Sequence, residues 1–191
     1  MFDQPAYDDK TFEKLVLTDG ITRNKEFQSC TFRNCELSSS TFTRCKFLEC
    51  TFEECNLSMA NFDASTINDV VFKGCKIMGV NFSKCEDFLF GVGFDGCILD
   101  YASFAGKKMV KTKFKRSSLK EVSFTQTNLT GSVFDECDLL DAVFNRTDLT
   151  SVNFTTAYNY ILDPELNILK KAIFAMTGLE GLLTKYGIKV V

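Results

Sequence analysis

The sequence has 191 residues, a net charge of −3, nine cysteines and no histidine, which fits a single domain with a full hydrophobic core. It shows no secretory signal and no apolar run of membrane-spanning length, so we expect a cytoplasmic protein with reduced thiols and no membrane partner. Without histidine and without an expected cleft, acid–base catalysis is disfavoured, and we expect no enzyme activity, no cofactor and no metal.

A bulky apolar side chain returns every five residues along nearly the whole chain. One run extends from Phe12 to Phe82, lapsing at Thr22, and a second extends from Phe94 to Phe154. A period of five matches neither an α-helix nor a flat strand and indicates an internal repeat. A small residue lies two positions before nearly every bulky centre. Two of every five side chains are therefore expected to point inward, with a corner after them.

The cysteines belong to this small inward position. All nine occupy it, and we interpret them as core spacers rather than metal ligands, because there is no C-x-x-C pattern and the thiols would face a phenylalanine-filled interior. Cys35, Cys55, Cys75 and Cys97 are expected to stack in one column. Neighbours there would approach disulfide range, but the expected compartment favours free thiols.

This repeat resembles the pentapeptide-repeat family over about residues 10–159. The resemblance implies an all-β fold, a right-handed quadrilateral parallel β-helix in which four five-residue sides form one coil, with coils stacked about 4.8 Å apart. Every fourth centre then falls in one column, which gives two phenylalanine columns facing two largely aliphatic ones. We assign residues 1–159 to this solenoid, with a corner bulge near 86–92.

The bulge marks a shift of two residues in the repeat. It is either a tolerated irregularity or a contact loop, because Phe88, Leu89 and Phe90 cannot all point inward. The segment 91–96 also spells G-x-G-x-x-G, but a dinucleotide site requires that pattern between a strand and a helix. Inside the repeat, we do not assign it a ligand.

The outward side chains differ from face to face. The first face, around the centres from Phe12 onward, alternates in charge from coil to coil and is interpreted as self-neutralising. The second face, around the centres from Leu17 onward, mixes carboxylates with exposed apolar residues and is interpreted as a partner-binding side. The residues expected to bind a partner are Met59, Met78, Asp100, Tyr101, Glu121, Asp138, Leu140 and Asp141, together with Phe88, Leu89 and Phe90 of the bulge.

One dense basic run lies between Lys107 and Lys120. It spans about one coil, so its charges spread over several faces. We interpret it as a solvated collar rather than a nucleic-acid patch, given the acidic overall balance, and expect no direct nucleic-acid partner.

The last residues, 160–191, are expected to form a helical cap. Asp163, Pro164 and Glu165 resemble a helix start, Gly178 opens a second short helix that Gly187 ends, and residues 188–191 read as a strand. This segment either shields the last coil or forms a homodimer; its apolar surface favours the dimer. The expected interface residues are Leu179, Leu182, Leu183, Tyr186 and Ile188.

A narrower resemblance concerns function. Residues 55–62 look like a segment of the Qnr quinolone-resistance proteins, and the bulge, the Asn159-Tyr160 step and the tail 185–190 resemble the albicidin and microcin immunity proteins. These relatives imply a homodimer that protects DNA gyrase or topoisomerase IV from inhibitors by DNA mimicry. The alternative hypothesis is a structural or scaffolding repeat protein with an unrelated protein partner. The sequence identifies neither the inhibitor nor the physiological partner.

Overall fold

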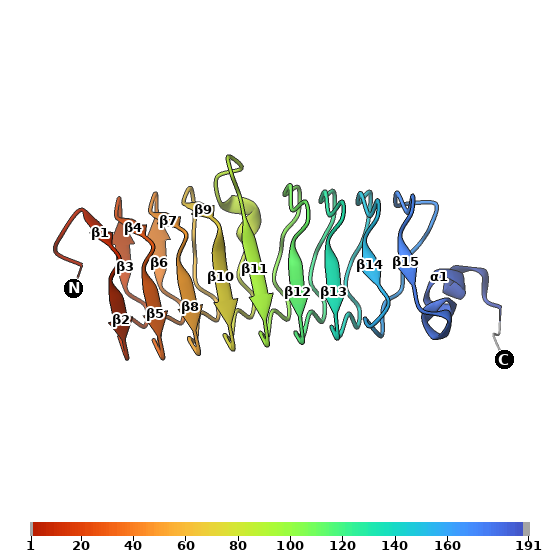
Figure 1. Cartoon of the computed structure of the whole chain (residues 1–191), viewed down its shortest axis with the longest axis horizontal. Helices are drawn as coiled ribbons and strands as arrows, with labels where there is room; N and C mark the ends of the chain where they lie inside the picture. The colour runs from red at the N-terminus through yellow and green to blue at the C-terminus, as the bar shows by residue number, and fades with distance from the viewer. Residues whose placement is uncertain (1, 189–191) are drawn as a thin grey trace.

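The chain forms a straight rod of stacked coils, with its two ends at opposite ends of the rod (Figure 1). The computed structural model describes residues 2–188. Phe12 pairs in register with Phe32, Phe32 with Phe52, and so on at steps of twenty residues, except that Phe72 pairs with Phe94. The predicted quadrilateral parallel β-helix is confirmed, and its two-residue shift lies where the sequence placed it.

Each side of the coil builds one parallel ladder. The first face is a nine-stranded sheet. Its strands are β2 (Thr11–Glu13), β5 (Thr31–Arg33), β8 (Thr51–Glu53), β10 (Val70–Lys73), β11 (Val92–Asp95), β12 (Lys113–Lys115), β13 (Val133–Asp135), β14 (Asn153–Phe154) and β15 (Ile173–Phe174). The third face carries β3 (Ile21–Arg23) and β6 (Thr41–Thr43), and the fourth carries β1 (Ala6–Asp8), β4 (Glu26–Gln28), β7 (Lys46–Leu48) and β9 (Thr66–Asn68). The second face is a ladder of single bridges from Val16–Glu36 to Asp138–Tyr158.

Phenylalanine rings fill the interior in continuous stacks. The ring centres of Phe114 and Phe134 lie 4.7 Å apart in the first-face column, and those of Phe104 and Phe82 lie 4.9 Å apart in the third-face column. The rings are nearly parallel in both cases. Phe114 also meets Phe124 edge to face, at 5.7 Å and 83°. The two phenylalanine columns therefore face each other. The expectation that each would face an aliphatic column is wrong, because the first and third sides of a four-sided coil lie opposite each other; their rings meet edge to face.

The small inward side chains also satisfy backbone groups. Ser132 Oγ donates to the carbonyl oxygen of Met109 at 2.8 Å, and Thr127 Oγ1 donates to that of Phe104 at 2.9 Å. Cys75 Sγ lies 3.4 Å from the carbonyl oxygen of Phe52 in the same arrangement. Cysteine, serine and threonine recur at this position because each supplies a short donor to the previous coil, a role that the sequence analysis did not identify.

All nine cysteines are free and buried, in line with the core-spacer interpretation. Burial raises the pKa of Cys50, Cys85 and Cys137 to about 12. Hydrogen bonding to neighbouring thiols, together with burial, also raises the pKa of Cys75. These thiols are therefore uncharged at neutral pH, and the thiolate is the reactive form.

We expect the native protein to resist thiol modification. A bulky maleimide at pH 7 should label almost no cysteine in the folded chain, and all nine after unfolding in urea, because burial keeps the reagent away from every thiol, and the raised pKa of Cys50, Cys75, Cys85 and Cys137 also suppresses thiolate formation there. The measurement is intact-mass analysis over time. Fast labelling of several thiols without denaturant would contradict the buried placement.

The solenoid continues further than the sequence analysis anticipated. No helix forms at Asp163, Pro164 and Glu165; instead Asp163 Oδ1 accepts a hydrogen bond from the Glu165 N–H at 2.8 Å and closes a turn. Residue Ile168 then bridges to Asp148, and β15 pairs with β14, so the segment completes a further coil. Aspartate before proline serves turns as well as helix starts, which explains the wrong prediction.

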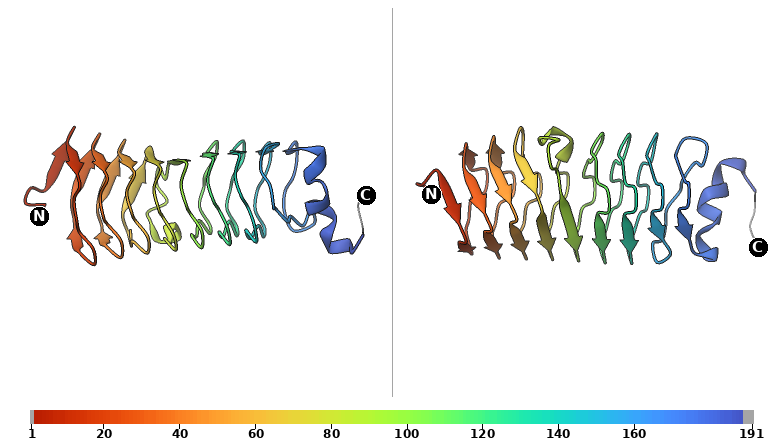
Figure 2. Two further views of the ribbon diagram at one scale, coloured as in Figure 1. Left: turned by 90° about the horizontal axis from the view of Figure 1, so that it is seen from below. Right: turned by 45° about the horizontal axis from the view of Figure 1, so that its top comes forward.

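The helical cap follows this coil and lies across the C-terminal end of the rod (Figure 2). It consists of the 3₁₀-helix η2 (Met176–Gly178), α1 (Glu180–Leu183) and the 3₁₀-helix η3 (Thr184–Tyr186), and Gly187 ends it with φ at 63°. Most of the strand predicted over 188–191 lies outside the described residues. Across the described part of the chain, no helix is long and apolar enough to cross a lipid bilayer.

Candidate partner-binding surfaces

The frame shift produces a loop that projects from one edge of the rod, in yellow-green beside β11 (Figure 1). It follows the 3₁₀-helix η1 (Phe82–Lys84). Phe88 is 75% exposed and Leu89 is 60% exposed, whereas Phe90 is buried and meets Phe82 edge to face at 6.2 Å. Phe88 and Leu89 are therefore available at the surface. Phe90 is not, so its assignment as a contact residue is wrong: its ring fills the core beneath the loop.

Lys107 anchors this loop from inside. Its side chain is 1% exposed and occupies the small inward position. The Nζ donates to the Cys85 carbonyl at 2.6 Å and to Asp87 Oδ1 at 2.5 Å, and it lies 5.3 Å from the centre of the Phe90 ring. Lys107 therefore does not belong to a solvated collar. The sequence signal was present, because the neighbouring coils carry the small residues Ser65, Thr127 and Thr147 at this position.

We expect Lys107→Met to destabilise the protein by about 1–3 kcal/mol, because the buried Cys85 carbonyl loses its partner while the volume is kept. The loop over 86–91 should also become sensitive to limited proteolysis. Urea denaturation and mass mapping of the cleavage site measure the two effects. Lys108→Met, one residue away and exposed, is the control. Equal stability and equal cleavage in both variants would argue against the anchor.

The second face ends in a corner where successive coils expose Tyr101, Glu121 and Asp141. All three have positive φ, between 55° and 64°, which turns each side chain outward. No basic side chain within residues 2–188 lies within 4.0 Å of either carboxylate. We call Tyr101, Glu121 and Asp141 the acidic edge. The exposed Met59 lies in the same corner column, two coils before Tyr101.

The other predicted carboxylates of this face have structural partners. Asp100 Oδ1 accepts hydrogen bonds from Ser118 Oγ at 2.6 Å and from the Lys120 N–H at 3.0 Å. Asp138 accepts from Asn159 Nδ2 at 2.8 Å and pairs with Lys120 at 3.4 Å. Both are half-buried, so they hold neighbouring coils together as well as contributing negative charge beside the edge. Leu140 is exposed beside them, whereas Met78 is half-buried.

The first face is self-neutralising around its middle. Glu53 lies between Arg33 and Lys73 in register and pairs with both, at 3.0 and 3.2 Å. Hydrogen bonds from Lys73 and Arg33 hold the pKa of Glu53 below its usual value. Exposed pairs of this kind contribute little stability each. They do cancel the charge of this face, which leaves the second-face corner as an unneutralised acidic feature.

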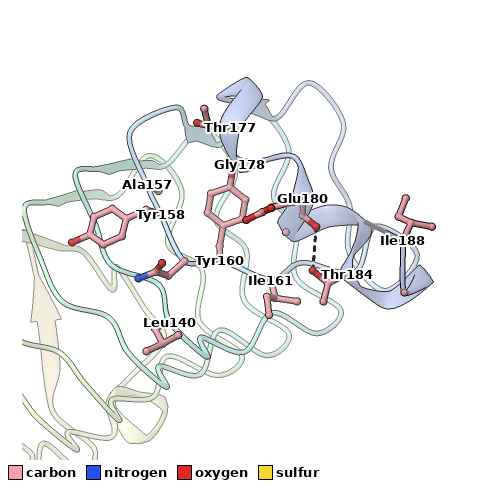
Figure 3. Close-up of a pocket in the computed structure, with 13 residues that line it drawn as sticks. Leu140, Ala157, Tyr158, Tyr160, Ile161, Thr177, Gly178, Glu180, Thr184 and Ile188 are labelled. Carbon is pink, nitrogen blue, oxygen red and sulfur yellow. Dashed lines mark hydrogen bonds between the residues drawn. The ribbon is translucent and has the colours of Figure 1, made fainter. Parts of the chain in front are cut away.

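The C-terminal end carries a groove of about 790 Å³ between the last coils and the cap. Figure 3 shows Tyr158, Tyr160 and Ile161 on one side of it, and Glu180, Thr184 and Ile188 on the other. Of the residues predicted to form a dimer, Leu179, Tyr186 and Ile188 are exposed, and Leu182 and Leu183 are half-buried. Exposed Ile173 and Met176 extend the same apolar area, which the sequence analysis did not include.

Charged contacts fasten the cap to the last coil. Lys185 Nζ donates to Asp163 Oδ1 at 2.6 Å and lies 2.8 Å from Glu165 Oε2, while the Tyr186 hydroxyl donates to Glu165 Oε1 at 3.0 Å. The hydrogen bonds from Lys185 lower the pKa of both carboxyl groups. The cap is therefore held in a defined position, with Leu179, Tyr186 and Ile188 exposed.

The described residues form a regular parallel β-solenoid with outward corners. The chain belongs to the pentapeptide-repeat family. The description "Pentapeptide repeat region" matches residues 25–104, and "Pentapeptide repeats (8 copies)" matches residues 117–155, which together cover more than half of the sequence. No curated protein matches the sequence significantly.

Several solved structures share the fold. A trypsin-treated form of QnrB1, a plasmid-mediated fluoroquinolone resistance protein, superposes with a TM-score of 0.59 at 18% identity, over 97% of this chain and 98% of that one. HetL, a pentapeptide-repeat protein involved in heterocyst differentiation regulation in the cyanobacterium Nostoc, gives a TM-score of 0.64 at 12% identity, over 91% and 87%. At 18% and 12% sequence identity, these superpositions show that the proteins share a fold.

Proposed function

We propose that this chain is a non-enzymatic protein-binding solenoid that protects DNA gyrase or topoisomerase IV from inhibitors. The acidic edge is the observation that carries the proposal. It sets Tyr101, Glu121 and Asp141 on successive coils at a rise of about 4.8 Å, free of ion pairs within the described chain. A rigid row of one tyrosine and two carboxylates, with Asp100 and Asp138 beside it, resembles the charged edge of duplex DNA, so it suits a protein groove that is built to hold DNA.

Two further features support this function. The likeness to QnrB1 extends along nearly the full length of both chains, and that protein is described as a resistance factor. The exposed Phe88 and Leu89 give the loop an apolar contact of the kind that anchors protein interfaces. The proposal places the protein in the cytoplasm, where it would meet a DNA-bound enzyme, and requires no cofactor.

A supercoiling assay tests the proposal. Gyrase inhibited by ciprofloxacin should regain supercoiling activity when the wild-type chain is added, and the chain should bind immobilised gyrase or topoisomerase IV. Bovine serum albumin at the same concentration controls for nonspecific protein. If the folded chain neither binds either enzyme nor relieves inhibition, the protection function is excluded.

We also propose that the chain is a homodimer joined through its cap. The exposed Leu179, Tyr186 and Ile188, with Ile173 and Met176 beside them, form an apolar end surface of the kind that homodimer interfaces bury. A cap that only shielded the last coil would present polar side chains to solvent.

Deleting residues 177–191 is expected to convert the dimer into monomers or aggregates, because the deletion removes most of this apolar surface and exposes the last coil. Light scattering measures the mass. Leu179→Glu, which leaves the contacts of Lys185 and Tyr186 with the last coil in place, separates loss of the interface from loss of the fold and should also give monomers. A dimer that persists in both variants would move the interface elsewhere.

The alternative function is a scaffold with an unrelated protein partner. Two observations favour it: the net charge is only −3, which is modest for a DNA mimic, and the HetL likeness has a TM-score as high as that of QnrB1. Binding to a protein other than a topoisomerase, with no effect on the supercoiling assay, is the expected result for this alternative.

A further inference from the structure

A second charged feature lies on the corner that follows the fourth face. Lys111 and Lys171 occupy this corner three coils apart, each with φ at 59°, and Gly131 and Ser151 occupy it in the two coils between them. Three more exposed lysines adjoin these two. We call the whole set the basic ridge; it consists of Lys108, Lys111, Lys113, Lys170 and Lys171.

The ridge is not neutralised by neighbouring side chains. In the part of the chain that the structure describes, no carboxylate lies within 4.0 Å of any of these five amines. In the backbone ladders, Lys108 lies next to Asn128 and Lys113 lies next to Val133, so both have uncharged residues as neighbours in the following coil. The one carboxylate within the ridge, Asp148, accepts the Thr150 N–H at 3.0 Å. This differs from the first face, where the charge reverses from each coil to the next.

The basic ridge and the acidic edge lie on diagonally opposite corners of the rod, because one follows the fourth face and the other follows the second. The net charge of −3 therefore conceals a segregated charge distribution over residues 101–171, whereas the ridge's corner carries Glu49 and Asp69 in the earlier coils. The sequence analysis missed this for two reasons. It treated the basic run as one coil spread over several faces, and it placed residues 170 and 171 in a helix rather than beneath Lys111 in the solenoid.

We propose that the basic ridge binds the phosphate backbone of duplex DNA. The Lys111 and Lys171 groups are separated by three coil rises, about 14 Å, which is close to the major-groove width of about 12 Å. Each group can then reach phosphates on one side of the groove. Between them, Thr130, Thr150 and Ser151 can supply hydroxyl groups to the DNA backbone, and Asp148 is the one carboxylate on this surface. A straight, rigid rod matches a stiff DNA duplex better than it matches a flexible polyanion.

This contact adds to protein binding rather than replacing it. A rod with carboxylates on one corner and lysines on the opposite corner can touch a basic protein groove and a DNA segment at the same time. The inference does not depend on topoisomerase binding, because it concerns DNA alone, so the two proposals fail separately.

Fluorescence anisotropy with a short labelled duplex and the full chain tests the ridge. We expect saturable binding at about 50 mM salt and a slope of log affinity against log salt of about −4 to −5, since each neutralised phosphate contributes about 0.9. Lys111→Ala with Lys171→Ala should reduce the slope by about 1.8 and the affinity by about 100-fold. Lys10→Ala with Lys14→Ala, which removes two exposed lysines at the other end of the rod, should leave both unchanged.

Three results would overturn the proposal. One is the absence of saturable DNA binding at low salt. Another is an equal loss of affinity in the ridge variant and the N-terminal control, which would indicate a nonspecific charge effect. The third is binding to phosphatidylserine vesicles without binding to DNA, which would assign the ridge to an anionic lipid surface instead.

Discussion

Replacing Phe104 with alanine is expected to lower the free energy of unfolding by about 3–5 kcal/mol. Phe104 is fully buried and stacks between Phe82 at 4.9 Å and Phe124 at 5.6 Å. It also meets Phe94 and Phe114 edge to face across the interior. The substitution removes a ring that contacts neighbours both along its own column and across the interior. The backbone cannot close over the cavity, because the coil spacing is fixed by the parallel ladders.

Urea denaturation followed by circular dichroism measures this effect. Phe88→Ala is the matched control, since the same change on the exposed loop should alter stability by no more than about 0.5 kcal/mol. Phe104→Leu should fall between the two, because it keeps part of the volume. If Phe104→Ala cost no more than Phe88→Ala, the stacked columns would not be the main source of stability.

The five-residue period predicted which side chains enter the core, which lie two residues before them, and where the frame shift falls. The four-sided coil, and with it the columns and the register of twenty, came from the resemblance to the pentapeptide-repeat family. The contact between the two phenylalanine columns follows from that coil, because its first and third sides lie opposite each other, and it was missed. Residues 163–171 were misassigned for a different reason: Asp163 and Pro164 are equally suited to a turn, and only pairing with the previous coil decides.

The candidate surfaces were predicted unevenly. Exposure at the corners follows from the repeat, so Tyr101, Glu121 and Asp141 were placed outward correctly. Hydrogen bonding between coils could not be predicted from the sequence, because the partners of Asp100 lie eighteen and twenty residues further along the chain. Lys107 shows the same limit. Its position in the repeat predicts a small buried side chain. Only the two extra residues of the frame shift provide space for the lysine side chain and oxygen atoms that accept hydrogen bonds from its amine.

The largest functional effect is expected from reversing the acidic edge. Glu121→Lys with Asp141→Lys should weaken binding to gyrase by about 100-fold, because each lysine meets a groove that is itself basic, and like charges brought together across an interface cost several kcal/mol. Wild-type binding should weaken with added salt, since exposed charges are screened over about 8–10 Å at physiological ionic strength. Surface plasmon resonance on immobilised gyrase at two salt concentrations measures both effects.

The matched control is Glu49→Lys with Glu136→Lys. These exposed carboxylates have the same corner geometry, with φ at 53° for both, but lie on other corners of the rod. The control has the same change in net charge, so its affinity should stay near that of the wild type. Asp100→Lys with Asp138→Lys should behave differently again and lower stability by about 1 kcal/mol for each hydrogen bond removed. A folded edge variant that binds gyrase as tightly as the wild type would rule out the acidic edge as the contact surface.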